Sequence, residues 1–302
     1  MESSKKEKII KAGKIASEVR DYARGIIKKD TPLIEIVEKI ESKIFELGGK
    51  PAFPTTLSID NVAAHYTPSY DDKTLSKGLL KIDFGVHIDG WTADNAFSVD
   101  LENNEENKRL IKASQDALEN SIKLIKEKLE NNLSVNLTEI GTEISKTIES
   151  NNFFPVINLT GHSMEQYNLH SGISIPNIET SIDLELEPGL YAIEPFATNG
   201  SGKVHDGKPS GIYELKSEKN VRSPIAREVL SLIINEYNTL PFCSRWIVKK
   251  IGSKAIFGLK QLEENGNLYQ FPELIEISDS RVSQTEHTIL IDKNGKVIIT
   301  TE

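Results

Sequence analysis

The sequence predicts an α+β fold, in which pairs of helices precede β-rich stretches. Apolar residues recur at helical spacing in two pairs of segments, at residues 5–48 and 104–150. A β-rich stretch follows each pair, and one stretch contains a strong hairpin signal. Helical pairs that each precede a β-rich stretch are what two halves of one design would show.

The first helical pair occupies residues 5–28 and about 31–48. An apolar stripe runs along the first segment at spacings of three and four, through Ile9, Ala12, Ala16, Val19, Ala23 and Ile26. Thr31 and Pro32 are typical of an N-cap and first helical position, and Gly48 with Gly49 marks the end. Residues 104–130 and 137–150 repeat the helical pattern and form the second pair.

The segment from Leu79 to Val99 predicts a β-hairpin around a two-residue turn at Asp89-Gly90. This turn pairs Ile88 with Trp91, hence Gly85 with Asp94 and Asp83 with Ala96. Asp83 and Asp94 then share one face as diagonal neighbours, about 7–8 Å apart at the backbone. Two carboxylates so placed can converge on divalent ions, although solvated strand-edge groups would show the same pattern.

The rest of the chain divides into a β-rich part and a helical part. Residues 153–200 predict short strands and tight loops, and strands return at 285–291 and 297–300. Between them, residues 211–271 are predicted to be helical. This segment therefore resembles an insertion into a β-rich domain.

Composition excludes several classes of protein. The 302 residues carry 36 basic and 45 acidic side chains, and this net charge of −9 argues against direct nucleic-acid binding. The single cysteine, Cys243, rules out an intrachain disulfide and a thiolate metal cage. No apolar stretch approaches the roughly 18 residues of a membrane span, so we expect a cytoplasmic protein that does not enter the membrane.

Motifs in eight places identify the chain with a known family. They are Phe53-Pro54, His65-Tyr66-Thr67-Pro68, Lys81-Ile82-Asp83-Phe84-Gly85, Ala93-Asp94, Gly161-His162, Leu169-His170, Ile193-Glu194-Pro195-Phe196 and Glu286-His287-Thr288. In this order they resemble the type 2 methionine aminopeptidases of metallopeptidase family M24, in the compact archaeal form, from roughly residue 8 to residue 292. The resemblance implies the pita-bread fold, with pseudo-twofold halves and a curved antiparallel sheet. It also implies a catalytic domain at 1–210 and 272–302 and a type 2 helical insertion at 211–271.

The resemblance further implies a centre of two divalent metal ions. Its ligands would be Asp83, Asp94, His162, Glu194 and Glu286, with Asp94 and Glu286 bridging both ions. Four carboxylates would neutralise two divalent cations. Oxygen-rich ligation with one imidazole suits Co, Mn, Fe or Zn, and ligand type does not choose among these metals.

The implied reaction is removal of the N-terminal methionine from nascent proteins and peptides, preferably before a small second residue. A hydroxide bridging the two ions would be the nucleophile. Glu194 would move protons, His170 would stabilise the oxyanion, and His65 would bind the substrate near the scissile amide. Phe53, Phe196 and Ile212 would line the methionine pocket, with Phe271 near them, although ordinary core packing would also explain these four residues.

Two positions depart from the type 2 pattern. Thr285 stands where many relatives have Phe, and Ile212 stands where some have His. We expect altered strand packing behind the site and a more apolar methionine pocket. His87, His205 and His287 are expected to lie outside the site. Because the substrate is a nascent chain, a ribosomal partner is plausible, and we expect a monomer.

The sequence leaves two alternative functions open. Prolidases and aminopeptidases P share the fold and a similar ligand set, but they usually carry an extra N-terminal domain, for which the first ligand at position 83 leaves no space. A metal-free binding protein on this fold, associated with ribosomes or RNA, would have lost ligands that are all present in this chain.

Overall fold

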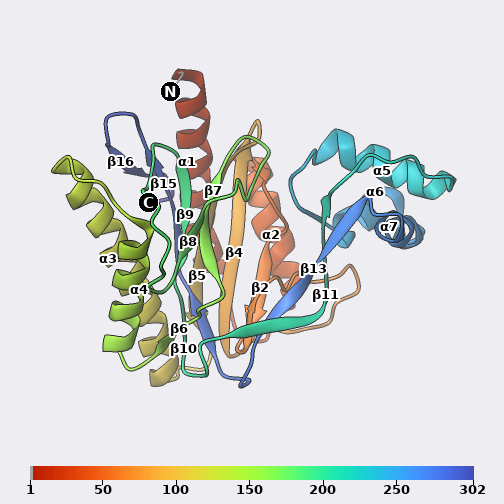
Figure 1. Cartoon of the computed structure of the whole chain (residues 1–302). Coiled ribbons are helices and arrows are strands. Elements are labelled where there is room, and N and C mark those ends of the chain that lie inside the picture. The colour runs from red at the N-terminus through yellow and green to blue at the C-terminus, as the bar shows by residue number, and fades with distance from the viewer. Residues whose placement is uncertain (1–2) are drawn as a thin grey trace.

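The computed structural model describes residues 3–302, in which helices flank a curved central sheet (Figure 1). The helices are α1 (Ser3–Ile26), α2 (Leu33–Glu46), α3 (Glu105–Glu130), α4 (Leu137–Ser150), α5 (Pro224–Glu236), α6 (Ser244–Ile251) and α7 (Ala255–Glu264). The strands are β1 (Lys50–Pro51), β2 (Thr56–Ile59), β3 (Val62–Ala64), β4 (Leu79–Ile88), β5 (Trp91–Asp100), β6 (Phe154–Pro155), β7 (Thr160–Met164), β8 (Ser174–Pro176), β9 (Leu190–Ile193), β10 (Phe196–Thr198), β11 (Val204–Leu215), β12 (Phe242–Cys243), β13 (Leu268–Glu276), β14 (Val282–Gln284), β15 (Glu286–Ile291) and β16 (Val297–Ile299).

The main sheet has nine strands. Its order is β1-β4-β5-β15-β9-β7-β8, with β2 paired to β4 and β16 paired to β15. Two smaller sheets have the orders β14-β10-β6 and β12-β11-β13-β3. Neighbouring strands in the main sheet run antiparallel, as the family resemblance implies.

The β4–β5 hairpin has the predicted register. Asp83 is opposite Ala96, Gly85 is opposite Asp94, and Ile88 is opposite Trp91. The turn residues Asp89 and Gly90 both have positive φ, 53° and 79°, as a type I′ turn requires. The local turn therefore places Asp83 and Asp94 on the same face of the sheet.

The two helical pairs form at the predicted places. The Asn104 side chain accepts hydrogen bonds from the backbone N–H groups of residues 106 and 107 at the start of α3, and Asn136 forms a capping box with Glu139 on α4. The start of α2 differs by one residue from the prediction. Pro32 is extended, with ψ 128°, and bridges to Leu75, so the helix begins at Leu33.

The molecule has two similar halves. Helices of 24 and 14 residues precede the first group of strands, and helices of 26 and 14 residues precede the second. α1 and α2 share an apolar core with β4 and β5, whereas α3 and α4 share one with β8, β9 and β15. The halves join in the middle of the main sheet, where β5 pairs with β15.

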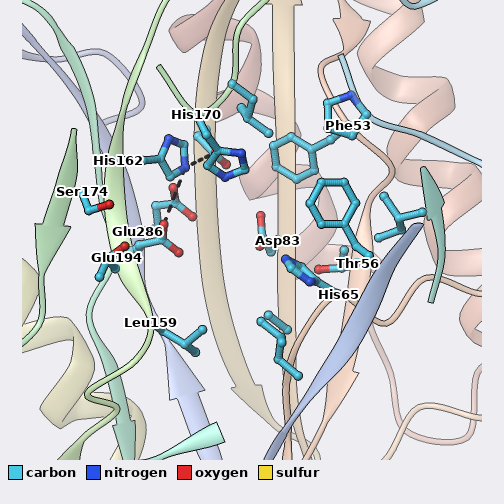
Figure 2. Close-up of a pocket in the computed structure, with 18 of the residues that line it drawn as sticks. Phe53, Thr56, His65, Asp83, Leu159, His162, His170, Ser174, Glu194 and Glu286 are labelled. Carbon is cyan, nitrogen blue, oxygen red and sulfur yellow. Dashed lines mark ion pairs between the residues drawn. The ribbon is translucent and has the colours of Figure 1, made fainter. Parts of the chain in front are cut away.

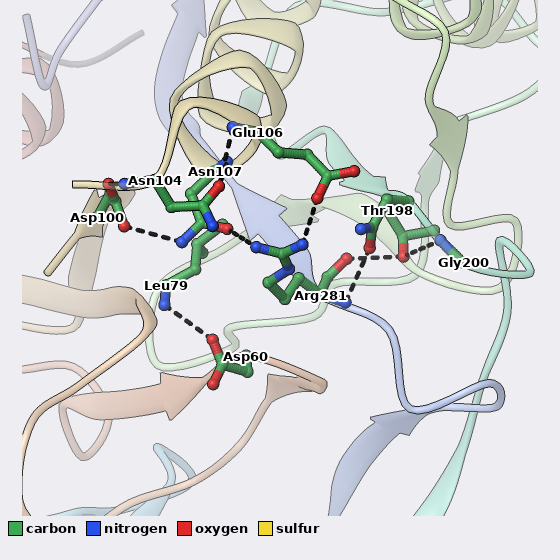
Figure 3. A network of polar contacts seen from close by, with 10 residues as sticks. Asp60, Leu79, Asp100, Asn104, Glu106, Asn107, Thr198, Gly200 and Arg281 are labelled. Carbon is green, nitrogen blue, oxygen red and sulfur yellow. Dashed lines mark hydrogen bonds and ion pairs between the residues drawn. The ribbon is translucent and has the colours of Figure 1, made fainter. Parts of the chain in front are cut away.

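A polar network holds the end of β5, the start of α3 and the approach to β14 together (Figure 3). Asn107 donates a hydrogen bond of 2.8 Å to Asp100 and accepts one from Arg281. Arg281 also forms an ion pair with Glu106, and its backbone oxygen accepts a hydrogen bond of 2.8 Å from Thr198. These contacts fix the position of residue 281, directly before β14.

The helices α5, α6 and α7 form a separate block beside the main sheet, reached through the long strands β11 and β13 (Figure 1). The block has its own apolar core, which includes Val229, Ile247 and Leu259. The expectation of helix across 211–271 is wrong at both ends, because residues 211–215 belong to β11 and residues 268–271 belong to β13. These segments pair with each other, which places Leu215 opposite Leu268.

In the part of the chain that the structure describes, no helix combines the length and the apolar character needed to cross a membrane.

Candidate metal centre and active site

One cavity of about 330 Å³ brings together the candidate metal ligands, the candidate catalytic histidines and the candidate methionine-pocket residues. Its walls include the five expected metal ligands, His65 and His170, and the four apolar side chains of Phe53, Phe196, Ile212 and Phe271. Figure 2 shows His162, Glu194 and Glu286 on one side and Phe53 with His65 on the other. Residues separated by more than 200 positions along the chain thus share one site.

The five acidic and imidazole groups come from adjacent strands of the main sheet. In spatial order across the sheet, Asp83 lies on β4, Asp94 on β5 and Glu286 on β15. Glu194 directly follows the last residue of β9, and His162 lies on β7. Ala96 is opposite both Asp83 and Glu286, so these two carboxylates lie in one row across the sheet. The sheet therefore works as the frame of the site.

Local packing explains why the strands approach so closely here. A Cβ atom on Gly161 would lie only 2.3 Å from the backbone oxygen of Ala192, so glycine is needed where β7 meets β9. On the other side, the Thr288 hydroxyl accepts a hydrogen bond from the Asp94 N–H at 2.7 Å and donates one to the Asp94 oxygen at 2.8 Å. These contacts place His162 and Asp94 next to each other.

The ligand atoms themselves lie close together. Asp94, His162 and Glu286 each offer a ligand atom within 4.8 Å of the others. His162 Nε2 lies 3.6 Å from Asp94 Oδ2 and 3.6 Å from Glu194 Oε1. Asp83 is connected to the other ligands through Gln284, whose amide nitrogen is 3.3 Å from Asp83 Oδ2.

Without a cation, this cluster of buried carboxylates is electrostatically unfavourable. No Lys or Arg among residues 3–302 lines the cavity. Burial and the mutual repulsion of the carboxylates raise the pKa values of Asp83, Glu194 and Glu286 well above their ordinary range, and burial raises the pKa of Asp94 to about 7. Burial also lowers the pKa of His162 to about 4, which leaves the imidazole neutral and able to ligate a metal.

The donor set fits a divalent cation. Asp83 Oδ1, Asp94 Oδ1 and Glu286 Oε1 are buried and have no hydrogen-bond partner in the described chain. Unpaired buried carboxylate oxygens are strongly disfavoured unless a cation coordinates them. The residues present therefore match a centre of carboxylate oxygens and one imidazole, the ligand type of hard and borderline divalent metals.

The sequence reasoning missed Gln284 as a member of the site. Its side chain is 1% exposed, and its amide nitrogen lies 3.3 Å from Asp83, 3.5 Å from Glu194 and 3.5 Å from Glu286. One amide thus offers its two N–H groups to three carboxylates. The spacing of two residues between Gln284 and Glu286, typical of side chains on one face of a strand, is the signal that could have found it.

Two further histidines border the metal ligands. The His170 ring lies 4.3 Å from the His162 ring, and burial together with these neighbouring histidines lowers the pKa of His170 to about 3. His65 adopts a positive φ of 67° and its Nδ1 lies 3.1 Å from the Pro272 oxygen. A non-glycine residue in this conformation is held there by its surroundings, which is common at functional sites.

The apolar end of the cavity is built by packing around Phe53. A Cβ atom on Gly85 would lie 2.4 Å from the Phe53 ring, so the glycine opposite Asp94 makes room for this side chain. Phe196 and Ile212 are buried, and Phe271 contacts the His65 ring edge to face at 5.6 Å. The cavity thus joins a charged end to an apolar end.

The residues expected outside the site lie outside it. His87, His205 and His287 do not line the cavity in the described chain. The Thr285 hydroxyl lies 2.9 Å from that of Ser114 on α3, so this departure from the type 2 pattern affects packing behind the sheet. Ile212 does line the cavity.

Comparisons with known proteins agree with this geometry. The profile of metallopeptidase family M24 matches residues 7–292. A methionine aminopeptidase of Methanocaldococcus jannaschii is 44% identical over 303 residues, which cover 99% of this chain and 100% of that protein.

Solved structures show the same fold. A methionine aminopeptidase from Thermotoga maritima has a TM-score of 0.70 at 22% identity, covering 100% of this chain and 98% of that one. A thermophilic Arx1 has a TM-score of 0.84 at 16% identity, covering 99% and 91%. The architecture is the pita-bread fold that the motifs imply. With its family profile matched over nearly its full length, the chain belongs to metallopeptidase family M24.

Proposed function

We propose that this protein removes the N-terminal methionine from proteins and peptides in a metal-dependent hydrolysis, preferably before a small second residue. One observation carries the proposal: a single cavity joins the unpaired carboxylates and His162 to an apolar end lined by aromatic and branched side chains. The 44% identity to a methionine aminopeptidase over the whole chain supports the same activity.

We assign two divalent ions to the cluster, which matches its four carboxylates in charge. Asp94 and Glu286 would be shared, His162 and Glu194 would complete one site, and Asp83 would complete the other. When bound, such ions lower the pKa of water and polarise the scissile carbonyl. Co, Mn, Fe and Zn all suit this donor set.

The chain's own residues would then handle protons and charge. Glu194 would accept a proton from the attacking water and pass it to the leaving amine. His170, with its pKa lowered to about 3, stays neutral, so its N–H can donate a hydrogen bond to the carbonyl oxygen as negative charge develops there. His65, held in its strained conformation, would bind the substrate beside the scissile amide.

The apolar end of the cavity would take the methionine side chain. Phe53, Phe196, Ile212 and Phe271 offer aromatic and branched surfaces and no charge. Ile212, where some relatives have His, removes one polar contact from this pocket. We therefore expect the first position of the substrate to be read mainly by apolar packing.

Assembly and location are part of the same proposal. We propose a monomer that acts on nascent chains in the cytoplasm, near the ribosome, with residues 211–271 as an insertion subdomain of the catalytic domain. Light scattering after size exclusion would report the oligomeric state. Co-sedimentation with ribosomes at low and moderate salt would report the partner.

The direct test is peptide hydrolysis by protein purified without chelator and loaded with Mn or Co. We expect methionine release from Met-Ala-Ser, followed by mass spectrometry, and no cleavage of an Xaa-Pro peptide. Cleavage of the proline peptide alone would make the protein a prolidase. No metal uptake and no turnover would make it a binding protein.

A variant of His65 separates substrate binding from metal binding. His65→Asn tolerates the positive φ of this position better than alanine and removes the imidazole. We expect unchanged metal content and slower hydrolysis. Normal turnover in this variant would remove His65 from the mechanism.

A further inference from the structure

A second cavity, of about 440 Å³, lies between the body of the protein and the helical block. Its walls come from α2, from the edge strand β1 with residue 87 of β4, and from the end of α5 through α6. Its volume falls in the range of small-molecule sites, about 300–1,000 Å³. None of its wall residues lines the cavity of the metal centre.

The walls of this second cavity are mainly apolar. Its aromatic and aliphatic surface comes from Phe45, Pro51, Tyr237, Leu240 and Trp246. Phe45 is 59% exposed, although phenylalanine is usually buried. Trp246 stacks on Tyr237 with ring centres 5.6 Å apart, so the two rings form one continuous stretch of the wall.

Most charges around the cavity already have partners. Glu41 is paired with Arg245, Glu38 with Lys249, and Glu236 with Lys250. The exception is Lys50, which has no ion pair or side-chain hydrogen bond with any residue in the described range 3–302. The cavity therefore presents one uncompensated positive charge.

A second donor stands beside Lys50. His87 is 7% exposed, and its Nδ1 accepts a hydrogen bond of 3.0 Å from the Gly90 N–H. In the neutral ring the proton is therefore on Nε2, for which the described chain provides no acceptor. Burial and the nearby Lys50 lower the pKa of His87 to about 4, so the ring stays neutral at physiological pH.

Two short chain segments connect the two cavities, although the cavities share no wall residue. Lys50 and Pro51 border the second cavity, and Phe53 and Pro54 of the same segment border the substrate pocket. In the same way, Leu240 borders the second cavity and Pro241 borders the substrate pocket. A molecule that shifts either segment would change the pocket proposed for methionine.

We propose that this second cavity binds a small organic carboxylate with an aromatic or branched apolar body, and that its occupancy changes the affinity of the substrate pocket. The apolar walls would hold the body, and Lys50 with the Nε2–H of His87 would bind the carboxylate. A cationic ligand is disfavoured because each carboxylate that lines the cavity already has a cationic partner. The binding of the carboxylate, which we call the binding half of the proposal, is independent of the proposed activity. The effect on the substrate pocket, which we call the coupling half, rests on that activity.

The binding half is tested with 2-naphthoate and its neutral counterpart 2-naphthamide, by calorimetry and Trp fluorescence on metal-free protein. We expect the acid to bind about tenfold more tightly than the amide, since only the acid pairs with Lys50. Lys50→Met should bring the acid to the affinity of the amide. Lys249→Met, which removes a lysine of the same cavity that already has a partner, should change the affinity less than about twofold.

The binding half would be overturned by equal affinities for acid and amide, by unchanged affinity in Lys50→Met, or by no binding up to millimolar acid. Thermal unfolding of each variant confirms that it is folded, and Lys50 is exposed on an edge strand. Loss of binding in Lys249→Met as in Lys50→Met would also count against it, because nonspecific charge would then explain the affinity.

The coupling half is tested with metal-loaded protein and Met-Ala-Ser. Saturating 2-naphthoate should change KM by about threefold or more, with a smaller change in kcat, and Lys50→Met should abolish the effect. Binding without any change in KM would overturn the coupling alone. If naphthoate binds as expected but the protein cleaves no methionyl peptide, the proposed function is refuted. The assignment of the second cavity then stays intact.

Discussion

Within residues 3–302, the carboxylates of the main cavity and the Glu41–Arg245 pair are both buried, and they are built in opposite ways. In the candidate metal centre, four carboxylates and one imidazole converge without any Lys or Arg from residues 3–302. At the junction with the helical block, Glu41 lies between Arg245, with two contacts of 2.8 Å, and the Trp246 N–H at 2.8 Å. In the first cluster the carboxylates repel one another, and a bound metal would remove this repulsion. In the second cluster the negative charge is already paired with a positive one.

This contrast distinguishes a candidate metal site from a structural contact between two parts of the protein. Glu41 and Arg245 are 6% and 3% exposed, and the Arg245 Nε also donates to the Pro68 oxygen at 3.1 Å. A bidentate, fully hydrogen-bonded pair of this kind locks α2 of the body to α6 of the block. Removing one carboxylate should therefore have opposite effects on stability in the two places.

The largest effect is expected from Asp94→Asn. The variant loses a charge that we assign to both ions, so turnover should fall on the order of a thousandfold, or about 4 kcal/mol in the barrier. Without metal, the same variant should melt at a higher temperature than the parent, because one repelling carboxylate is gone. A lower melting temperature of the metal-free variant would contradict this account of the cluster.

Glu41→Gln should destabilise the protein by about 3–5 kcal/mol, because it leaves Arg245 buried without its counter-charge. Denaturant unfolding of both proteins measures the difference. The matched control is Glu38→Gln, one turn earlier on α2, whose partner Lys249 lies 3.4 Å away and is mostly exposed. We expect almost no change in the control, since exposed pairs contribute little. Equal losses would mean that burial does not distinguish the two pairs.

Stability should also depend on pH in opposite directions with and without metal. The pKa of Asp94 is raised from 3.8 to about 7, so the folded metal-free protein keeps protons that the unfolded chain has lost. Measured relative to metal-free Asp94→Asn, in which the buried histidines are still present, its free energy of unfolding should therefore fall between about pH 4 and pH 7. With metal bound, stability should rise over the same window, because protons compete with the ions. Unfolding at pH 5 and pH 7.5, with and without chelator, checks the sign.

A smaller effect is expected at Gln284, whose amide contacts three of the carboxylates. Gln284→Leu should weaken metal affinity about 10- to 100-fold, as loss of a residue that orients metal ligands usually does. Gln284→Glu has nearly the same shape and adds another carboxylate. In this variant, the difference in melting temperature between metal-loaded and metal-free protein should be larger than in the parent. Unchanged calorimetric affinity in both variants would show that the amide does not orient the ligands.

The sequence by itself determined the local parts of this protein. The helical pairs follow from apolar spacing and from caps such as Asn104, and the Asp89-Gly90 turn alone set the register that puts Asp83 and Asp94 on one face. Such interactions act over a few residues, so they are readable from the chain. His162, Glu194 and Glu286 became candidates through the family resemblance, because no local rule connects them to the hairpin.

Only the tertiary structure decided which distant segments meet. The pairing of β5 with β15, and of Asp94 with Thr288 across 194 positions, depends on how both halves pack. The same reason explains the misplaced ends of the helical block, where β11 and β13 become strands by pairing with each other. Gln284 among the carboxylates and the second cavity beside Lys50 likewise exist only once strands and helices from separate parts of the chain are in contact.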